Sequence, residues 1–424
     1  MVASPAAVAG AVSPPPIDNS LLPPAAAPVP PRPTVRHDDC VTPPEESPAA
    51  AHPTVQDLDA VWALTRGAGQ TVAVIDTGVA RHRRLPHLIP GGDYVWKQDG
   101  TADCDGHGTA VAGIIAASPD VGDPAAFTGL APDAAILAIR QSSNKFRADG
   151  DAAAAGFGDV ETLAAAVRTA ADLGAGIINI SSVACLPADT VLDDRALGAA
   201  LAYAVDVKNV VVVSAAGNVG GPGQCPDQNP AGPAADVAVV ASPAWYDDLV
   251  LTVGSVGADG VASPFTLAGP WVDVAAPGED VISLAAAADG LVDRTPAGTG
   301  LSGTSYAAPV VSAVAALVRA RFPELTARQV MARIEDTARP AAGGANPSVG
   351  RGVVDALAAV SGPAGTGVPA PPPAPAPVAL PVRAPEAAPS GSPVRAAVIC
   401  LALVGGVGVA VAAKGRLRSA VPRD

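Results

Sequence analysis

Four polar residues have the types that hydrolysis of a peptide bond requires, and they occur in the order Asp76, His107, Asn218 and Ser305. This chemistry needs an activated nucleophile, a proton shuttle, a group that orients the shuttle, and donors for the oxyanion. A serine, a histidine and an aspartate fill the first three roles, and an asparagine amide can donate to an oxyanion. The sequence therefore contains one candidate for each part of a serine-peptidase mechanism.

Each of these motifs has another interpretation when it is taken alone. The run Asp76-Thr77-Gly78 also occurs in aspartic peptidases, but those enzymes need two such carboxylates, and no second Asp-Thr-Gly or Asp-Ser-Gly is present. Ser305 lies among small residues, as in the nucleophile elbow of α/β-hydrolases, but in those folds the chain order is Ser, acid, His. The order Asp, His, Ser argues against both alternatives.

Short apolar runs alternate with helical stretches through the middle of the chain. The predicted strands are 71–76, 134–140, 176–181, 210–218 and 249–256, and the predicted helices are 107–117, 159–174 and a long helix through residue 321. This alternation predicts a parallel sheet covered on both faces, which is an α/β fold. All four candidate residues then lie at strand ends or helix starts, where sites form in open α/β sheets.

Composition and charge exclude some partners and cofactors. The formal net charge is −14, which repels phosphate backbones and argues against nucleic acid as a partner. No Cys-x-x-Cys pair and no convincing acidic cluster is present, so neither a metal nor another cofactor is predicted. Four cysteines of the globular part, Cys40, Cys104, Cys185 and Cys225, suit two disulfides in an oxidising compartment. Their spacing leaves three pairings open.

Two unusual segments precede the globular part. Residues 1–12 are small and apolar, and they resemble the end of a secretory signal peptide whose basic beginning is missing; an alanine-rich disordered terminus is the alternative. Residues 13–54 contain Pro-Pro-Pro and Pro-Pro without periodicity, which predicts an extended, polyproline-like segment. The globular domain itself is expected over residues 55–360.

The C-terminal segments predict a membrane anchor. Residues 361–394 are rich in proline and predict a semi-rigid spacer. Residues 396–413 are 18 uncharged residues, which as a helix extend roughly 27 Å and just cross a bilayer core. The basic tail, residues 414–424, places the C-terminus in the cytoplasm and the domain outside the cell membrane.

In this order and context the motifs resemble those of the subtilases, the subtilisin-like serine peptidases, from about residue 57 to residue 360. The stretches that carry the resemblance are 74–78, 106–109, 216–218, 269–278 and 303–309. The resemblance implies a three-layer αβα fold with a mostly parallel central sheet, and an endopeptidase acting on proteins or peptides.

The resemblance also implies a role for each site residue. Ser305 attacks the scissile carbonyl, His107 carries the proton, and Asp76 orients the histidine, as in a Ser-His-Asp triad. Asn218 and the Ser305 amide form the oxyanion hole. The strand edges that bind the substrate are formed by Ser181, Ser182 and Val183 on one side and by Ala216 and Gly217 on the other.

A narrower resemblance is to the mycosins, the membrane-anchored subtilases of type VII secretion systems. It is carried by residues 103–107, 180–187 and 224–226 and by the two proline-rich flanks. It implies the pairings Cys40–Cys104 and Cys185–Cys225. It further implies that the chain processes secreted proteins and has components of the secretion membrane complex as partners. The alternative is a mainly structural subunit of that complex.

Three features depart from ordinary subtilases. The N-terminal extension is too rich in proline for a folded inhibitory pro-domain, which predicts a clamp whose removal changes stability more than activity. Val183 stands where subtilases usually carry glycine, which predicts a narrower pocket that favours small residues at the cleavage point. Residues 141–158 form a long insertion, for which a tolerated surface loop is favoured over a segment that covers the cleft or is nicked by proteases.

Overall fold

The computed structural model describes residues 12–42, 57–122, 127–190, 192–221, 224–230, 237–287, 289–342 and 344–363. The chain divides into two units, residues 1–368 and 369–424, and the second lies outside the described residues. The predicted transmembrane helix, the basic tail, most of the spacer and nearly all of the signal-peptide remnant therefore lie outside them too. Within the described part, no helix is long and apolar enough to cross a membrane.

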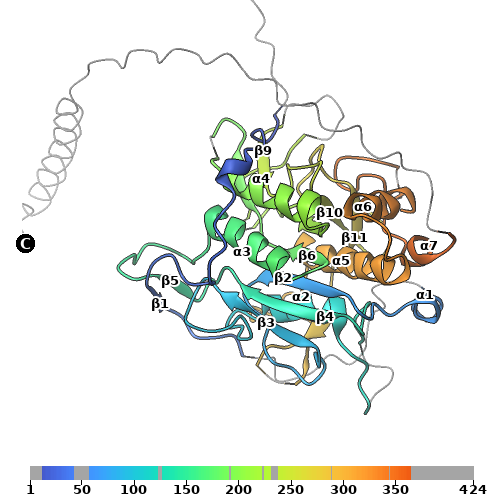
Figure 1. Cartoon of the computed structure of the whole chain (residues 1–424), viewed down its shortest axis with the longest axis horizontal. Helices are drawn as coiled ribbons and strands as arrows, with labels where there is room; N and C mark the ends of the chain where they lie inside the picture. Colours follow the sequence, from blue (N-terminus) through green and yellow to red (C-terminus); the bar gives the residue numbers. More distant parts are fainter. Residues whose placement is uncertain are drawn as a thin grey trace, which may run out of the picture. The chain divides into compact units, whose positions relative to one another are not determined.

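A seven-stranded parallel sheet forms the centre of the domain (Figure 1). Its strands are β2 (Thr71–Asp76), β3 (Leu88–Asp93), β4 (Ala135–Arg140), β6 (Ile177–Ile180), β8 (Val211–Ala215), β10 (Leu251–Val256) and β11 (Val274–Pro277). Their spatial order is β11-β10-β8-β6-β2-β4-β3, and every neighbouring pair is parallel. The predicted parallel sheet is confirmed. Its two edge strands, β3 and β11, have weak sequence signals because β3 contains Pro90 and two glycines and β11 is short.

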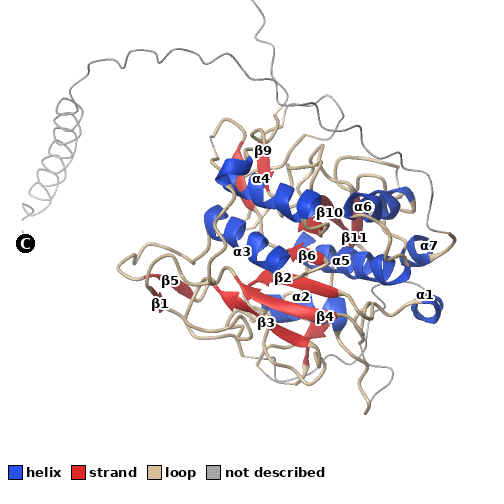
Figure 2. Ribbon diagram, viewed as in Figure 1, coloured by secondary structure: helices blue, strands red, loops and turns tan. Residues whose placement is uncertain are grey.

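Two pairs of helices cover the sheet. The main helices are α2 (His107–Ala116), α3 (Val160–Asp172), α4 (Arg195–Ala202) and α5 (Thr304–Arg321). From β3 the chain passes through α2 to β4, and from β4 it passes through α3 to β6. Both helices contact β2 and β4, but they pack against different helix partners and belong to different layers. Helix α5 packs against α2, and α4 packs against α3, which completes the outer layers (Figure 2).

Smaller elements decorate this core. They are η1 (Asn19–Leu21), β1 (Thr34–Arg36), α1 (Leu58–Leu64), β5 (Phe146–Ala148), β7 (Ala184–Pro187), η2 (Tyr203–Val207), β9 (Val239–Ser242), β12 (Ser283–Leu284), β13 (Leu291–Val292), α6 (Ala327–Asp336) and α7 (Ala356–Val360). Three two-stranded antiparallel sheets join β1 with β5, β7 with β9, and β12 with β13. Two of these small sheets lie beside the candidate site, as described below.

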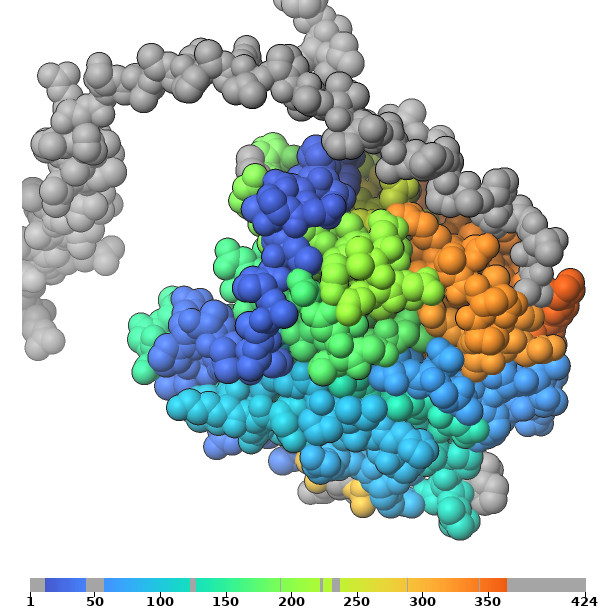
Figure 3. Space-filling model, viewed as in Figure 1, coloured from blue at the N-terminus to red at the C-terminus, as the bar shows by residue number. Residues whose placement is uncertain are grey.

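The N-terminal extension lies along the surface of the domain. Figure 3 shows it in dark blue, crossing the green part of the molecule. Its strand β1 pairs with β5, which belongs to the 141–158 insertion, so this insertion anchors the extension. Closer to its start, the carbonyl of Pro23 accepts a hydrogen bond of 3.2 Å from Arg168 on α3.

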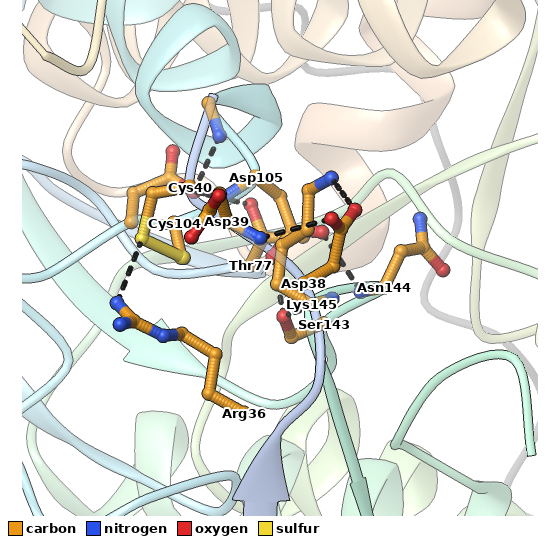
Figure 4. The surroundings of a disulfide bond; sticks show 12 residues. Arg36, Asp38, Asp39, Cys40, Thr77, Cys104, Asp105, Ser143, Asn144 and Lys145 are labelled. Carbon is orange, nitrogen blue, oxygen red and sulfur yellow. Dashed lines mark hydrogen bonds and ion pairs between the residues drawn. A yellow bond between two sulfur atoms is a disulfide. The ribbon is translucent and has the colours of Figure 1, made fainter. Parts of the chain in front are cut away.

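A small second core lies under the β1–β5 pair. It consists of Val95, Cys104, Phe146, Ala148 and Phe157. Cys104 forms a disulfide with Cys40 of the extension, and Figure 4 shows the surroundings of this bond. The extension is thus attached to the domain by a strand pair and by a covalent bond, as a clamp would be.

We expect the double substitution Cys40→Ser/Cys104→Ser to lower the stability of the domain. The disulfide closes a chain segment of 64 residues, and the chain-entropy model gives about 4 kcal/mol for a loop of that size. The midpoint of urea unfolding and the melting temperature should both fall, whereas turnover of a small peptide should change much less. Wild type with and without a reducing agent serves as the control. Equal midpoints for the variant and the oxidised wild type would contradict the clamp.

Candidate active site

Asp76 ends strand β2 and has an almost fully buried side chain, 2 % exposed. One oxygen, Oδ1, accepts hydrogen bonds from the Thr77 amide at 2.7 Å and from Nδ1 of His107 at 2.7 Å. The second bond requires that Nδ1 carries a proton, which leaves Nε2 of the neutral ring as the basic nitrogen. Asp76 therefore selects the tautomer in which His107 can accept a proton from a nucleophile.

Steric constraints explain the glycine that follows His107, the first residue of α2. A Cβ at Gly108 would lie 2.0 Å from the Gly78 carbonyl oxygen and 3.1 Å from Cβ of Asp76. Only glycine allows α2 to approach the turn after β2 this closely. The Gly108 amide also donates to the Thr77 hydroxyl at 2.9 Å. A glycine after His107 thus lets α2 come close enough for the imidazole to reach Asp76.

Electrostatics favour the protonated form of His107. Burial lowers the pKa of His107, but the charge of Asp76 and the hydrogen bond to it, followed by the charges of Asp103 and Asp105, outweigh burial and raise the pKa. The side chain is still 29 % exposed, so it is accessible to a reacting group. The interactions that raise the pKa of His107 also stabilise the imidazolium that forms when a serine proton is transferred.

Ser305 is the second residue of α5. Hydrogen bonds from other residues hold its backbone in place. Its carbonyl oxygen accepts a hydrogen bond of 2.8 Å from the Ser181 hydroxyl, which in turn accepts one of 2.9 Å from Asn179. Ser312 donates to the other side of Asn179 at 2.8 Å. This buried chain of hydrogen bonds joins the start of α5 to β6, so it fixes the backbone of Ser305 relative to the sheet. The helix N-terminus also favours negative charge at this point.

Tyr306 brings the start of α5 next to the histidine. The rings of His107 and Tyr306 have centroids 5.2 Å apart, and both residues line one cavity. Burial raises the pKa of Tyr306, so its hydroxyl stays neutral. Ser305 immediately precedes Tyr306, so the start of α5 lies beside the Asp76–His107 pair.

Asn218 lies beyond the end of β8 with its amide oriented by Thr304. Its Oδ1 accepts from the Thr304 amide at 2.9 Å and from the Thr304 hydroxyl at 3.1 Å. This arrangement assigns the oxygen to Thr304 and directs the NH₂ group elsewhere. A Cβ at Gly303 would lie 3.1 Å from Oγ of Ser305 and 3.5 Å from Nδ2 of Asn218. The amide donor and the serine hydroxyl therefore face the same small space, as an oxyanion hole requires.

The other predicted substrate residues lie on either side of this space. Ser181 and Ser182 follow β6, and Val183 precedes β7. Gly217 donates its amide to the Thr304 hydroxyl at 3.2 Å, and a Cβ at Gly217 would lie 3.4 Å from Val183. Val183 thus approaches the segment after β8 that contains Gly217. Ser181 has a role that the sequence did not reveal, because its hydroxyl holds the Ser305 backbone.

Asp103 is a site residue that the sequence analysis missed. Its Oδ1 accepts from the Thr77 hydroxyl at 2.9 Å and the Gly106 amide at 2.8 Å, and its Oδ2 accepts from the Thr109 amide at 2.9 Å. Burial raises the pKa of Asp103 to about 6, although these hydrogen bonds oppose the rise. Asp103 therefore ties the turn after β2 to the first turn of α2. The available signal was an acid four residues before His107.

Both disulfides have the pairing that the mycosin resemblance implies. Cys40 is bonded to Cys104, and Cys185 is bonded to Cys225. Cys225 also lies against Gly217, because a Cβ there would meet its sulfur at 3.0 Å. Each disulfide thus supports one side of the site. Among the described residues, no group of three or more His, Cys, Asp or Glu side chains is arranged to hold a metal ion.

We expect Asn218→Ala to reduce kcat by about 10²–10³-fold with little change in KM, because an oxyanion donor acts mainly in the transition state. Kinetics on a fluorogenic peptide measure both constants. Thr304→Ser is the matched control, since serine keeps the hydroxyl bond to Asn218. An Asn218→Ala enzyme with unchanged kcat would remove Asn218 from the oxyanion hole.

Comparison with known proteins agrees with this geometry. The profile of the Subtilase family, peptidase S8, matches residues 67–354. Mycosin-4 of Mycobacterium tuberculosis (strain ATCC 25618 / H37Rv) is 62% identical over 362 residues, covering 84% of this chain and 79% of that protein. Mycosin-3 of the same organism is 41% identical over 396 residues, covering 86% of this chain and 85% of that protein.

Solved structures show the same fold. The MycP3 protease from the type VII (ESX-3) secretion system has a TM-score of 0.76 and 44% identity, covering 82% of this chain and 100% of that chain. A chain of the intact ESX-5 inner membrane complex has a TM-score of 0.76 and 40% identity, covering 96% of this chain and 100% of that chain. The domain therefore has a subtilisin-like α/β fold. The chain belongs to the subtilase family of serine peptidases and, within it, to the mycosins.

Proposed function

We propose that the chain is a membrane-anchored endopeptidase that uses Asp76, His107 and Ser305 as its catalytic triad and serves a type VII secretion system by processing secreted proteins. The observation that carries the catalytic part is the 2.7 Å hydrogen bond between buried Asp76 and Nδ1 of His107, beside the start of α5. The secretion role is supported by the mycosin relatives, among them proteases from ESX-3 and a chain of the ESX-5 inner membrane complex.

The geometry supports a two-stage hydrolysis. The Ser305 hydroxyl attacks the scissile carbonyl carbon while its proton passes to Nε2 of His107. The oxyanion accepts hydrogen bonds from Nδ2 of Asn218 and from the Ser305 amide. His107 then gives the proton to the leaving amine, which releases the first product and leaves an acyl-enzyme. Water attacks this ester in the same way, with His107 as base and then as acid.

The anchor is assigned to residues 396–413, followed by the basic tail, residues 414–424. Their apolar length and their charge asymmetry support a single-pass helix with the catalytic domain outside the cytoplasm. Components of the secretion membrane complex are the proposed partners. The anchor is tested by measuring how much of the protein stays in membranes after carbonate extraction, for the full chain and for a chain without residues 396–424.

Val183 supports a preference for small residues at the cleavage point. Its side chain approaches Gly217 across the predicted binding edges, where a glycine would leave more room. A peptide library should show small residues before the scissile bond in wild type. Val183→Gly should admit larger ones, and a wild-type profile dominated by bulky aromatics would overturn the assignment.

The secretion role is tested in cells that lack the gene. Cells complemented with the Ser305→Ala chain should accumulate unprocessed forms of secreted proteins, which mass spectrometry of their N-termini detects. If every secreted protein keeps its normal N-terminus, the processing role is wrong. Export itself separates two modes of support. If export stops in cells with the Ser305→Ala chain, export requires cleavage. If export continues in those cells and stops only in cells that lack the gene, the protein supports the complex by its presence.

A further inference from the structure

A cavity of about 500 Å³ opens beside the histidine and is formed by three separate parts of the chain. His107 and Tyr306 form its catalytic side. The segment from β12 to residue 301 forms the wall opposite, with Ala286, Val292 and Leu301 among its side chains. The third part is the N-terminal extension, which contributes Val41 and Thr42.

The extension is held firmly at this cavity. The Val41 amide donates to the Cys104 carbonyl at 2.9 Å, and the preceding residue, Cys40, is bonded to Cys104. A Cβ at Gly106 would lie 2.9 Å from Cγ2 of Val41, so Val41 packs on the residue just before His107. Figure 4 shows Cys40, the residue before Val41, near Asp105. Val41 is therefore a fixed wall of the cavity.

The position of the cavity relative to the triad tells which part of a substrate reaches it. In the proposed mechanism, Asn218 receives the oxyanion, the edges around Val183 and Gly217 bind the acyl half, and His107 gives its proton to the leaving amine. The cavity is lined by His107 and Tyr306 and by none of the residues assigned to the acyl half. Because His107 protonates the leaving amine, this lining favours contact with the leaving half of the substrate.

The chemistry of the walls favours an apolar side chain. Val41, Ala110, Val292 and Leu301 present hydrocarbon surface. The carboxylate of Asp105, which also borders the cavity, accepts hydrogen bonds from the Ser143 hydroxyl and, at 2.8 Å, from the Asn144 amide. Arg294 also lines the cavity, and its guanidinium is paired with Asp293 at 2.8 Å. A site with apolar walls whose carboxylate and guanidinium are already paired binds hydrocarbon better than charge.

We propose that this cavity binds a bulky apolar side chain one or two residues after the scissile bond, and that Val41 of the extension is a specificity-determining residue of the peptidase. The proposal rests on the proposed function, because it takes the cleavage reaction as given. It gives the extension a part in substrate selection in addition to its attachment to the domain.

The test is cleavage-site profiling of the full-length protein in detergent with a peptide library, read by mass spectrometry. Wild type should enrich Leu, Met or Phe within two residues after the cut. Val41→Asp should lower kcat/KM for the best such peptide by about tenfold relative to its glycine analogue, the size expected for lost apolar contacts. Val29→Asp is the matched control on the same extension, since Val29 is 61 % exposed and does not line the cavity, and it should keep the wild-type profile.

A second variant acts from the opposite wall. Ala286→Phe fills the cavity without altering the extension, and it should shift the preference toward small residues even if Val41→Asp does not fold. Labelling by a small fluorophosphonate, which has no residue after its reacting centre, checks the triad in each variant. Cleavage with a profile that neither variant changes would overturn the inference. Absence of both labelling and cleavage in wild type would instead overturn the proposed function.

Discussion

Ser305→Ala is expected to lower kcat by about 10⁶-fold, the loss found when the nucleophile of a subtilisin triad is removed. No other group takes over, because the His107–Asp76 pair activates only a hydroxyl placed at the start of α5. The buried hydrogen bond from Ser181 to the Ser305 carbonyl involves only the backbone of residue 305, so the substitution keeps it. The fold and melting temperature should therefore stay near wild type. Fluorogenic peptide turnover and fluorophosphonate labelling measure the loss.

Ser302→Ala is the matched control for the nucleophile. Ser302 lies three residues earlier in the same segment, is exposed, and accepts a hydrogen bond of 3.1 Å from the Asp280 amide. It should label and turn over like wild type. Labelling that persists in Ser305→Ala, at any other serine, would show that the nucleophile has been assigned wrongly.

Asp76→Asn is expected to lower kcat by about 10⁴-fold, as for the corresponding change in other serine-peptidase triads. The substitution keeps the size of the side chain but removes the charge that orients His107. An amide whose NH₂ group faces Nδ1 would also favour the opposite tautomer, with the proton on Nε2. In that tautomer His107 cannot take the proton of Ser305.

The same variant should change the pH dependence of the remaining activity. Only neutral His107 acts as a base, so kcat/KM rises as pH increases through the pKa of His107. The Asp76 charge is the main factor that raises this pKa. Without it the pKa falls, and the acidic limb of the profile should move to lower pH. Asp105→Asn should move it in the same direction by less, since Asp105 contributes least among the three acids. A limb that stays in place or moves to higher pH would contradict the assigned coupling.

The part of the fold that the sequence predicted is the part with long-run periodicity. Continuous apolar runs such as residues 71–76 and 249–256 form inner strands β2 and β10, because both faces of a parallel sheet are buried. The candidate residues were found because such strands end in polar residues at one edge of the sheet. Asp76 and Asn218 both follow buried runs, so their positions could be predicted from pattern alone.

What the sequence did not predict depends on contacts between distant, short segments. The pairing of β1 with β5 joins residues more than a hundred positions apart through three-residue strands, which have no periodicity to detect. Asp103 and Ser181 act through side-chain hydrogen bonds whose partners lie on other elements, and their residue types are common in loops. The cysteine pairings came from the mycosin resemblance, because spacing alone allowed three.

The disulfide between Cys40 and Cys104 links the N-terminal extension covalently to the loop that precedes His107. Cys104 is three residues before His107, and the intervening turn is held by Asp103 to the loop after Asp76. Tension applied to the N-terminal end of the chain would be opposed first by the hydrogen bond between Pro23 and Arg168, next by the β1–β5 ladder and last by this covalent bond. A load that broke the ladder would pass directly into the turn that carries the histidine. The three residue pairs of the β1–β5 ladder therefore protect the geometry around His107 from a pull on the N-terminus.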